Sequence, residues 1–140
     1  MAALTQARKT KIFRTGKFPI KGFTQKAGTV IFKGGMAMHV AGVFQPAASG
    51  VASSVYAGIA VRTYDCSARL TDYTWPTDQP MEFERDAAAF AGKSGDLPTD
   101  SNLGGLVYVS SDNEVKATMA SNDVSLYLLS QDGVNFIVVP

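Results

Sequence analysis

The segment from Ala87 to Ser94 (AAAFAGKS) comes closest to a catalytic motif in this chain. Gly92-Lys93-Ser94 matches the end of a phosphate-binding P-loop, but Ala87 stands where the first glycine of that motif belongs. The missing glycine normally opens the tight loop whose backbone N–H groups hold the phosphates. Gly95-Asp96-Leu97-Pro98 then follows where a helix should begin. We therefore interpret this segment as a turn and expect it to bind no nucleotide.

The single histidine, His39, and the single cysteine, Cys66, are the next candidates for catalysis. His39 could act as a general base for Cys66 or for a serine. However, no G-x-S-x-G elbow accompanies it, and a lone histidine among small apolar residues is typical of a packed or interface position. Cys66 is interpreted as a small apolar residue. One residue of each type excludes an internal disulfide and a Cys/His zinc site within one chain, so we predict no enzyme, no cofactor and no structural metal.

Two acidic residues, Glu82 and Glu84, alternate with the apolar Met81 and Phe83, and Asp86 continues the acidic row. Paired carboxylates can perform acid–base chemistry or bind calcium. The alternative is the solvated outer face of a strand whose other face is buried. We favour this alternative.

Three aromatic residues are candidate interface residues: Tyr56, Tyr64 and Trp75. Trp75 lies in the polar stretch YTWPT, and an aromatic residue in a polar loop often anchors an interface, although it could also cover the end of a barrel. Residues 55–64 alternate, which leaves Tyr56 and Tyr64 on the face opposite the expected core. The expected core set is Val55, Ala57, Ile59, Val61 and Thr63.

The N-terminal 26 residues are basic and carry Phe13, Phe18 and Phe23, each five residues apart. This spacing matches neither the helical repeat of about 3.6 residues nor the strand repeat of about 2, so we predict an extended arm over residues 1–26. Cations and rings could follow a single-stranded nucleic acid, or could fill pockets on an acidic protein surface. A third interpretation is a solvated tail, but such tails are poor in aromatic residues and this segment carries three phenylalanines. The expected contact residues are Arg8, Lys9, Lys11, Phe13, Arg14, Lys17, Phe18, Lys21 and Phe23.

Charge is divided unevenly along the 140-residue chain. Residues 1–64 hold nine basic and no acidic side chains, whereas residues 65–140 hold four basic and twelve acidic ones. Such a division suits a basic segment that lies on an anionic surface and is joined to a mildly acidic body. No apolar run reaches about 18 residues, so no transmembrane helix is expected. The N-terminus also lacks a secretory apolar region, which predicts a protein made and used without export.

Residues 27–140 are predicted to form one domain of many short strands. Two hairpins are the clearest elements, one with strands at 106–110 and 114–119 and the other with strands at 124–129 and 135–139. Residues 66–80 are interpreted as a long surface connection, and residues 87–91 as a helical turn or the start of a loop. With seven or eight short strands and no long helix, the predicted class is all-β, a small β-barrel or sandwich with an extended N-terminal arm.

Three stretches together resemble the bacteriophage capsid decoration, or cement, proteins. They are A-G-x-V-x-x-x-G-G at 27–35, G-[IV]-A-x-x-T at 58–63, and L-G-x-x-V-Y-V-x-x-D at 103–112 ahead of a terminal strand pair. The likeness covers about residues 27–140. The long connection at 66–80 and the basic arm depart from the family pattern.

The resemblance implies a non-enzymatic virion protein made in the host cytoplasm and placed on the exterior of a phage head, at symmetry axes and often as a homotrimer. Such a protein stabilises the head by clamping neighbouring major capsid protein subunits, and the family shares no catalytic residues. No membrane partner is expected. The alternatives are a small-barrel nucleic-acid-binding protein with a basic aromatic arm, and a tail or fibre component of the same virion.

Overall fold

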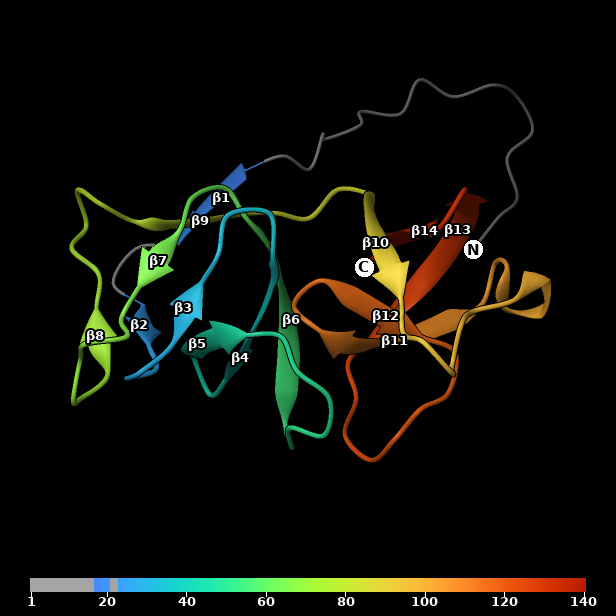
Figure 1. Ribbon diagram of the computed structural model, residues 1–140. Helices are drawn as coiled ribbons and strands as arrows, with labels where there is room; N and C mark the ends of the chain where they lie inside the picture. Colours follow the sequence, from blue (N-terminus) through green and yellow to red (C-terminus); the bar gives the residue numbers. More distant parts are fainter. Residues whose placement is uncertain (1–16, 21–22) are drawn as a thin grey trace, which may run out of the picture.

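The computed structural model describes residues 17–20 and 23–140 (Figure 1). Fourteen strands and one short 3-10 helix, η1 (Asp100–Asn102), lie in this part of the chain, and the predicted all-β class is confirmed. The strands are β1 (Lys17–Ile20), β2 (Thr24–Gln25), β3 (Val30–Ile31), β4 (Met36–Val40), β5 (Val43–Pro46), β6 (Ser54–Ala60), β7 (Tyr64–Asp65), β8 (Tyr73–Thr74), β9 (Met81–Glu84), β10 (Ala88–Gly92), β11 (Leu106–Ser111), β12 (Glu114–Lys116), β13 (Ser125–Asp132) and β14 (Asn135–Val139).

The strands form two main units that lie side by side (Figure 1). A seven-stranded sheet has the order β1-β9-β6-β4-β5-β2-β8, and five later strands close a barrel in the order β10-β12-β11-β13-β14. β3 and β7 make a separate two-stranded sheet. The strand count exceeds the predicted seven or eight partly because β2, β7 and β8 are only two residues long, too short to leave an alternating pattern in the sequence.

Strands β4 and β6 lie between two hydrophobic cores and contribute to both. Met36 and Met38 of β4 pack with the barrel interior, whereas Ala37 between them packs into the second core on the opposite face. The barrel interior supplies the larger share of the first core, including Phe90, Val109, Leu126 and Phe136. The sheet and the barrel are therefore joined by a shared core.

A β-bulge in β6 overturns the predicted alternation of residues 55–64. Ala37 of β4 faces Gly58, but Met38 faces Tyr56, so Ala57 is an extra residue that shifts the pattern by one. As a result Val55 is 51% exposed, while Tyr56 is buried against the barrel core. The prediction that Tyr56 lies on an outer face is wrong, because β6 lies between the two cores and both of its faces are covered.

The two C-terminal hairpins are confirmed. β11 pairs with β12, and β13 pairs with β14, both antiparallel and close to the predicted bounds. Residues 87–91 differ from the prediction, because β10 occupies most of this stretch and pairs with both β12 and β14. Phe90 is buried there among small alanines, which carry no strand signal of their own.

The sheet begins earlier than the predicted boundary at residue 27. β1 pairs antiparallel with β9, and β2 lies between β5 and β8, so both strands fall within the expected arm. Gln25 of β2 is fully buried. The remaining arm residues, 1–16 and 21–22, lie outside the described residues.

Candidate functional site

The predicted contact residues of the N-terminal segment are only partly described. Lys17 and Phe18 lie in β1, where the register sets them opposite Glu84 and Phe83 of β9. Phe23 keeps 42% of its surface exposed and packs edge-on against buried Phe44, with ring centroids 5.4 Å apart. The others lie outside the described residues: Arg8, Lys9, Lys11, Phe13, Arg14 and Lys21.

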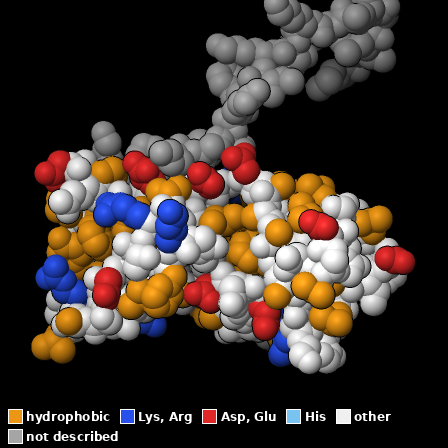
Figure 2. All heavy atoms as spheres, turned by 45° about the horizontal axis from the view of Figure 1, so that its top comes forward, with side chains coloured by type: hydrophobic (Ala, Val, Ile, Leu, Met, Phe, Trp, Pro, Cys, Tyr) orange, Lys and Arg blue, Asp and Glu red, His pale blue; other side chains and the backbone are white. Residues whose placement is uncertain are grey.

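An acidic strand edge adjoins β1. Met81 and Phe83 of β9 are buried, while Glu82 is half-buried and Glu84 is exposed, so the predicted outward face is confirmed. Asp86 follows, also exposed. Figure 2 shows acidic side chains spaced along the upper margin of the molecule. A strand from the basic N-terminal segment therefore pairs with a strand that presents carboxylates.

Trp75 is part of a hydrogen-bonded cluster around the buried Gln25. The indole Nε1 donates to Gln25 Oε1 at 3.0 Å, and Gln25 Nε2 donates to the Tyr64 carbonyl at 2.9 Å and to the Thr29 carbonyl at 3.2 Å. The Trp75 ring meets Tyr64 edge-on, with centroids 5.5 Å apart. Trp75 is half-buried and packs against the second core, so its side chain covers that core from solvent.

Tyr64 and Tyr56 do not form an exposed interface. Tyr64 is fully buried, and its hydroxyl donates to the Glu82 carbonyl and accepts from the Glu82 N–H at 2.6 Å. Tyr56 is buried too, and its burial raises the pKa of the phenol to about 12 against an opposing effect of Arg85. Both were candidate interface residues, and this expectation is corrected because their rings fill the two cores.

Arginine side chains cover the aromatic rings at this end of the sheet. The Arg62 guanidinium lies 4.6 Å from the Tyr64 centroid and 5.5 Å from that of Trp75, and it donates to the Pro80 carbonyl at 3.0 Å. Arg69 lies 4.0 Å above the Tyr73 ring. These cation–π contacts occupy ring faces that a stacked base would need.

The role of Trp75 can be tested by replacing it with phenylalanine. Trp75→Phe keeps an aromatic ring but leaves the buried Gln25 Oε1 without its donor, which should lower the free energy of unfolding by about 1–3 kcal/mol. Urea unfolding followed by circular dichroism measures this loss. Tyr73→Phe is the matched control, because no hydrogen bond of its hydroxyl is found among the described residues. If the unfolding midpoint of Trp75→Phe is unchanged, the indole hydrogen bond does not stabilise the fold, and Trp75 remains a candidate interface residue only.

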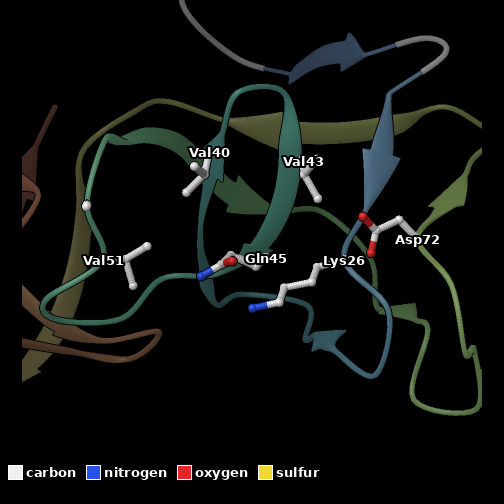
Figure 3. A pocket seen from close by; sticks show the side chains of 7 residues that line it. Lys26, Val40, Val43, Gln45, Val51 and Asp72 are labelled. Carbon is white, nitrogen blue, oxygen red and sulfur yellow. The ribbon is translucent and has the colours of Figure 1, made fainter.

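A shallow groove of about 400 Å³ lies beside the β4–β5 hairpin (Figure 3). Val40, Val43 and Val51 give it apolar walls, while Lys26 reaches in beside Gln45. Asp72 at its rim accepts a hydrogen bond from the Ala27 N–H at 2.9 Å. The groove mixes apolar walls with single charges and brings together no set of groups suited to catalysis.

The residues considered for catalysis are each held in a structural role. His39 accepts a hydrogen bond at Nδ1 from the Gly42 N–H of the β4–β5 turn, at 3.3 Å, and its ring packs on Phe44. Cys66 is buried, and this burial raises the pKa of its thiol. Lys93 is exposed in the turn after β10, so the P-loop-like segment is a strand followed by a turn.

A buried ion pair, which the sequence did not predict, joins the sheet to the barrel. Lys116 Nζ lies 2.8 Å from Asp123 Oδ2 and donates to Ser49 Oγ at 2.9 Å. Asp123 also accepts from Ser49, Gly50 and Ala120, at 2.6, 2.8 and 2.6 Å. Burial alone would raise the pKa of Asp123, but these donors outweigh it and lower the pKa to about 2. The pair fastens the loop after β5 onto the barrel.

Among residues 17–20 and 23–140, no group of three or more His, Cys, Asp or Glu side chains is placed to hold a metal ion. No helix in the same part of the chain is long and apolar enough to cross a membrane. No family model, curated protein or solved structure matches the chain. Function is therefore inferred from the charge distribution, the exposed surfaces and the sequence resemblance.

Proposed function

We propose that this protein is a non-enzymatic subunit of a phage head that binds the outer capsid surface and clamps neighbouring major capsid protein subunits. It is made in the host cytoplasm and acts on the particle as a homotrimer. The observation that carries the proposal is the separation of charge between the N-terminal segment and the body. Residues 1–22 contain six basic and no acidic side chains, whereas residues 23–140 contain seven basic and twelve acidic ones.

The position of β1 supports a tethering role for this segment. β1 is hydrogen-bonded along the edge of the seven-stranded sheet, so the sixteen residues before it start from a fixed point on the body. Sixteen residues can span at most about 55 Å, far enough to reach from one subunit to a neighbour. The N-terminal segment and the body would then bind the same particle at two places. Binding of one raises the effective concentration of the other at its own site, which strengthens the overall binding.

The nucleic-acid alternative has less support from the described surface. Binding to single strands uses open aromatic faces, but Arg62 and Arg69 already lie over Tyr64, Trp75 and Tyr73. The sheet edge beside β1 also presents Glu82 and Glu84, which would repel phosphates. In the capsid proposal, by contrast, the basic segment is the tether and the acidic body docks separately on the head.

Removing residues 1–16 tests the proposal. The truncated chain should remain folded, because all described strands and both cores begin at residue 17 or later. Its affinity for heads that lack this protein should fall at least about tenfold, the effect of losing one buried phenylalanine such as Phe13. Co-sedimentation with purified heads measures binding, and circular dichroism checks the fold. Truncation beyond residue 20 is a poorer test because it also removes β1.

Two matched variants separate rings from charges in the same segment. Phe13→Ala should release the protein from heads at about 0.15 M salt, since burial of a ring is screened little by ions. Replacing Arg8, Lys9, Lys11 and Arg14 with glutamine should weaken binding mainly at low salt. Full-strength binding of the truncated chain to heads would refute the tether. Sub-micromolar binding to oligonucleotides, falling about 10³-fold or more between 50 and 200 mM salt, with none to heads, would establish the nucleic-acid alternative.

A further inference from the structure

The outer wall of the barrel carries an exposed apolar surface, here called the barrel face: Leu106, Tyr127, Leu129, Ile137 and Val139. In β14, in β11 up to Ser110 and in β13 up to Leu129, buried residues of the barrel interior alternate with outward-facing ones, of which Ile137 and Val139 are half-buried. Leu106, Tyr127 and Leu129 are 41%, 52% and 51% exposed. Adjacent exposed apolar residues of this size mark an interaction site more often than scattered ones do.

The register makes the barrel face continuous. Leu106 lies directly opposite Tyr127, and Tyr127 lies directly opposite Val139, so three neighbouring strands contribute one row. Leu129 follows at the bulge in the β13–β14 pairing, and Ile137 lies beside it opposite Ser130. Neighbouring strands are about 4.8 Å apart, which brings these side chains into contact distance of a single partner. Figure 1 shows the three strands in the barrel.

The barrel face also lacks charge. The outward positions of β11 between Leu106 and Ser110, and of β13 between Ser125 and Leu129, hold only Leu, Tyr and Ser. Two other exposed regions are charged: one carries Glu82, Glu84 and Asp86, and the other carries arginines over the aromatic rings. The two ends of the molecule therefore suit different partners.

We infer that the barrel face binds a second copy of this chain. Residues close to a symmetry axis lie near their equivalents in the other copies, so a charge at such a position meets a like charge and is repelled. A neutral apolar face avoids this repulsion, while it offers a charged partner nothing to pair with. The barrel face is then the contact for the self-association that is part of the proposed function, on which this proposal rests. Head binding through the N-terminal segment does not require this contact, so the two can be tested separately.

Sedimentation velocity of the full chain, from about 1 µM to about 1 mM, tests the inference. The wild-type mass should rise above the 14.9 kDa of one chain with concentration. Leu106→Glu and Leu129→Glu should each raise the association midpoint at least about tenfold, because a carboxylate would face its equivalent across the axis. Leu70→Glu and Val134→Glu, at loop positions 98% and 82% exposed, are the matched controls and should associate as the wild type does.

Circular dichroism separates loss of association from loss of fold. If a glutamate variant unfolds, Leu106→Thr and Leu129→Thr retain strand propensity and should show the same shift in direction. A wild-type chain that remains at 14.9 kDa up to about 1 mM overturns the inference. The inference is also overturned if the Leu106 and Leu129 variants remain folded and associate as the wild type does. If the wild type is monomeric throughout and Leu129→Glu instead loses binding to heads, the occupant of the barrel face is the capsid protein.

Discussion

Replacing Lys116 with methionine is expected to lower the free energy of unfolding by about 3–5 kcal/mol. Lys116 is 5% exposed, and its ammonium group is the only cation among the described residues that forms an ion pair with Asp123. Methionine fills a similar volume but leaves the Asp123 carboxylate buried without its counter-charge. Breaking one partner of a buried pair is costly because the remaining charge has lost both water and its counter-ion.

Urea unfolding followed by circular dichroism measures this loss, and Lys93→Met is the matched control at an exposed lysine. The double variant Lys116→Met, Asp123→Leu should be less destabilised than the sum of the two single variants, because it removes the orphaned charge. It should not match the wild type, since the N–H groups of Gly50 and Ala120 lose their acceptor. A loss below about 1 kcal/mol for Lys116→Met would mean that the pair is solvated, as surface pairs are.

The same pair has a pH signature. The folded-state pKa of Asp123 is about 2, below the value of about 3.9 for an unfolded chain, so the pair stabilises the fold fully above about pH 4. This contribution is lost as pH falls through about 2, when the folded protein also takes up the proton. The urea midpoint of Lys116→Met should therefore fall less than that of the wild type between about pH 4 and pH 2.

The extent to which the fold could be predicted depends on how regular each element is. The two C-terminal hairpins were predictable because β11, β13 and β14 alternate over most of their buried residues and are joined through turn residues. β6 was predicted to have one outer face, but both faces are covered because the strand lies between the two cores, and a bulge also interrupts its alternation. β1 was assigned to the arm because it contains Pro19, a residue that disfavours strands, and β2 because two residues are too few to show a period.

The candidate surfaces were predictable to different degrees. The outward acids Glu82 and Glu84 followed directly from alternation in β9. The barrel face was visible in principle, since Leu106, Tyr127 and Leu129 are apolar at positions that alternation turns outward. The ion pair between Lys116 and Asp123 was not, because only the folded chain shows that the loop around Ser49 covers both charges.

Gly58→Ala is expected to destabilise the protein by about 2–6 kcal/mol, from backbone strain and from overpacking together. Gly58 has φ +128°, a conformation that residues with a Cβ rarely adopt. A Cβ at this position would lie 2.6 Å from the Glu84 carbonyl oxygen and 3.1 Å from Phe83 Cβ. Neither atom belongs to a flexible side-chain end, so β9 itself must move to admit the methyl group.

Gly133→Ala in the β13–β14 turn is the matched control for Gly58→Ala. Gly133 also has a positive φ, of +63°, but a Cβ there would meet no atom within 4 Å, so only the left-handed conformation costs energy, about 1–2 kcal/mol. Urea unfolding of both variants separates the contact with β9 from the conformational effect, and equal losses would show that the bulge tolerates a side chain. Because β9 is also the strand that pairs with β1, a displaced β9 should loosen β1, which attaches the N-terminal segment to the body. Folded Gly58→Ala protein should then bind heads more weakly than Gly133→Ala, although neither residue is an expected capsid contact.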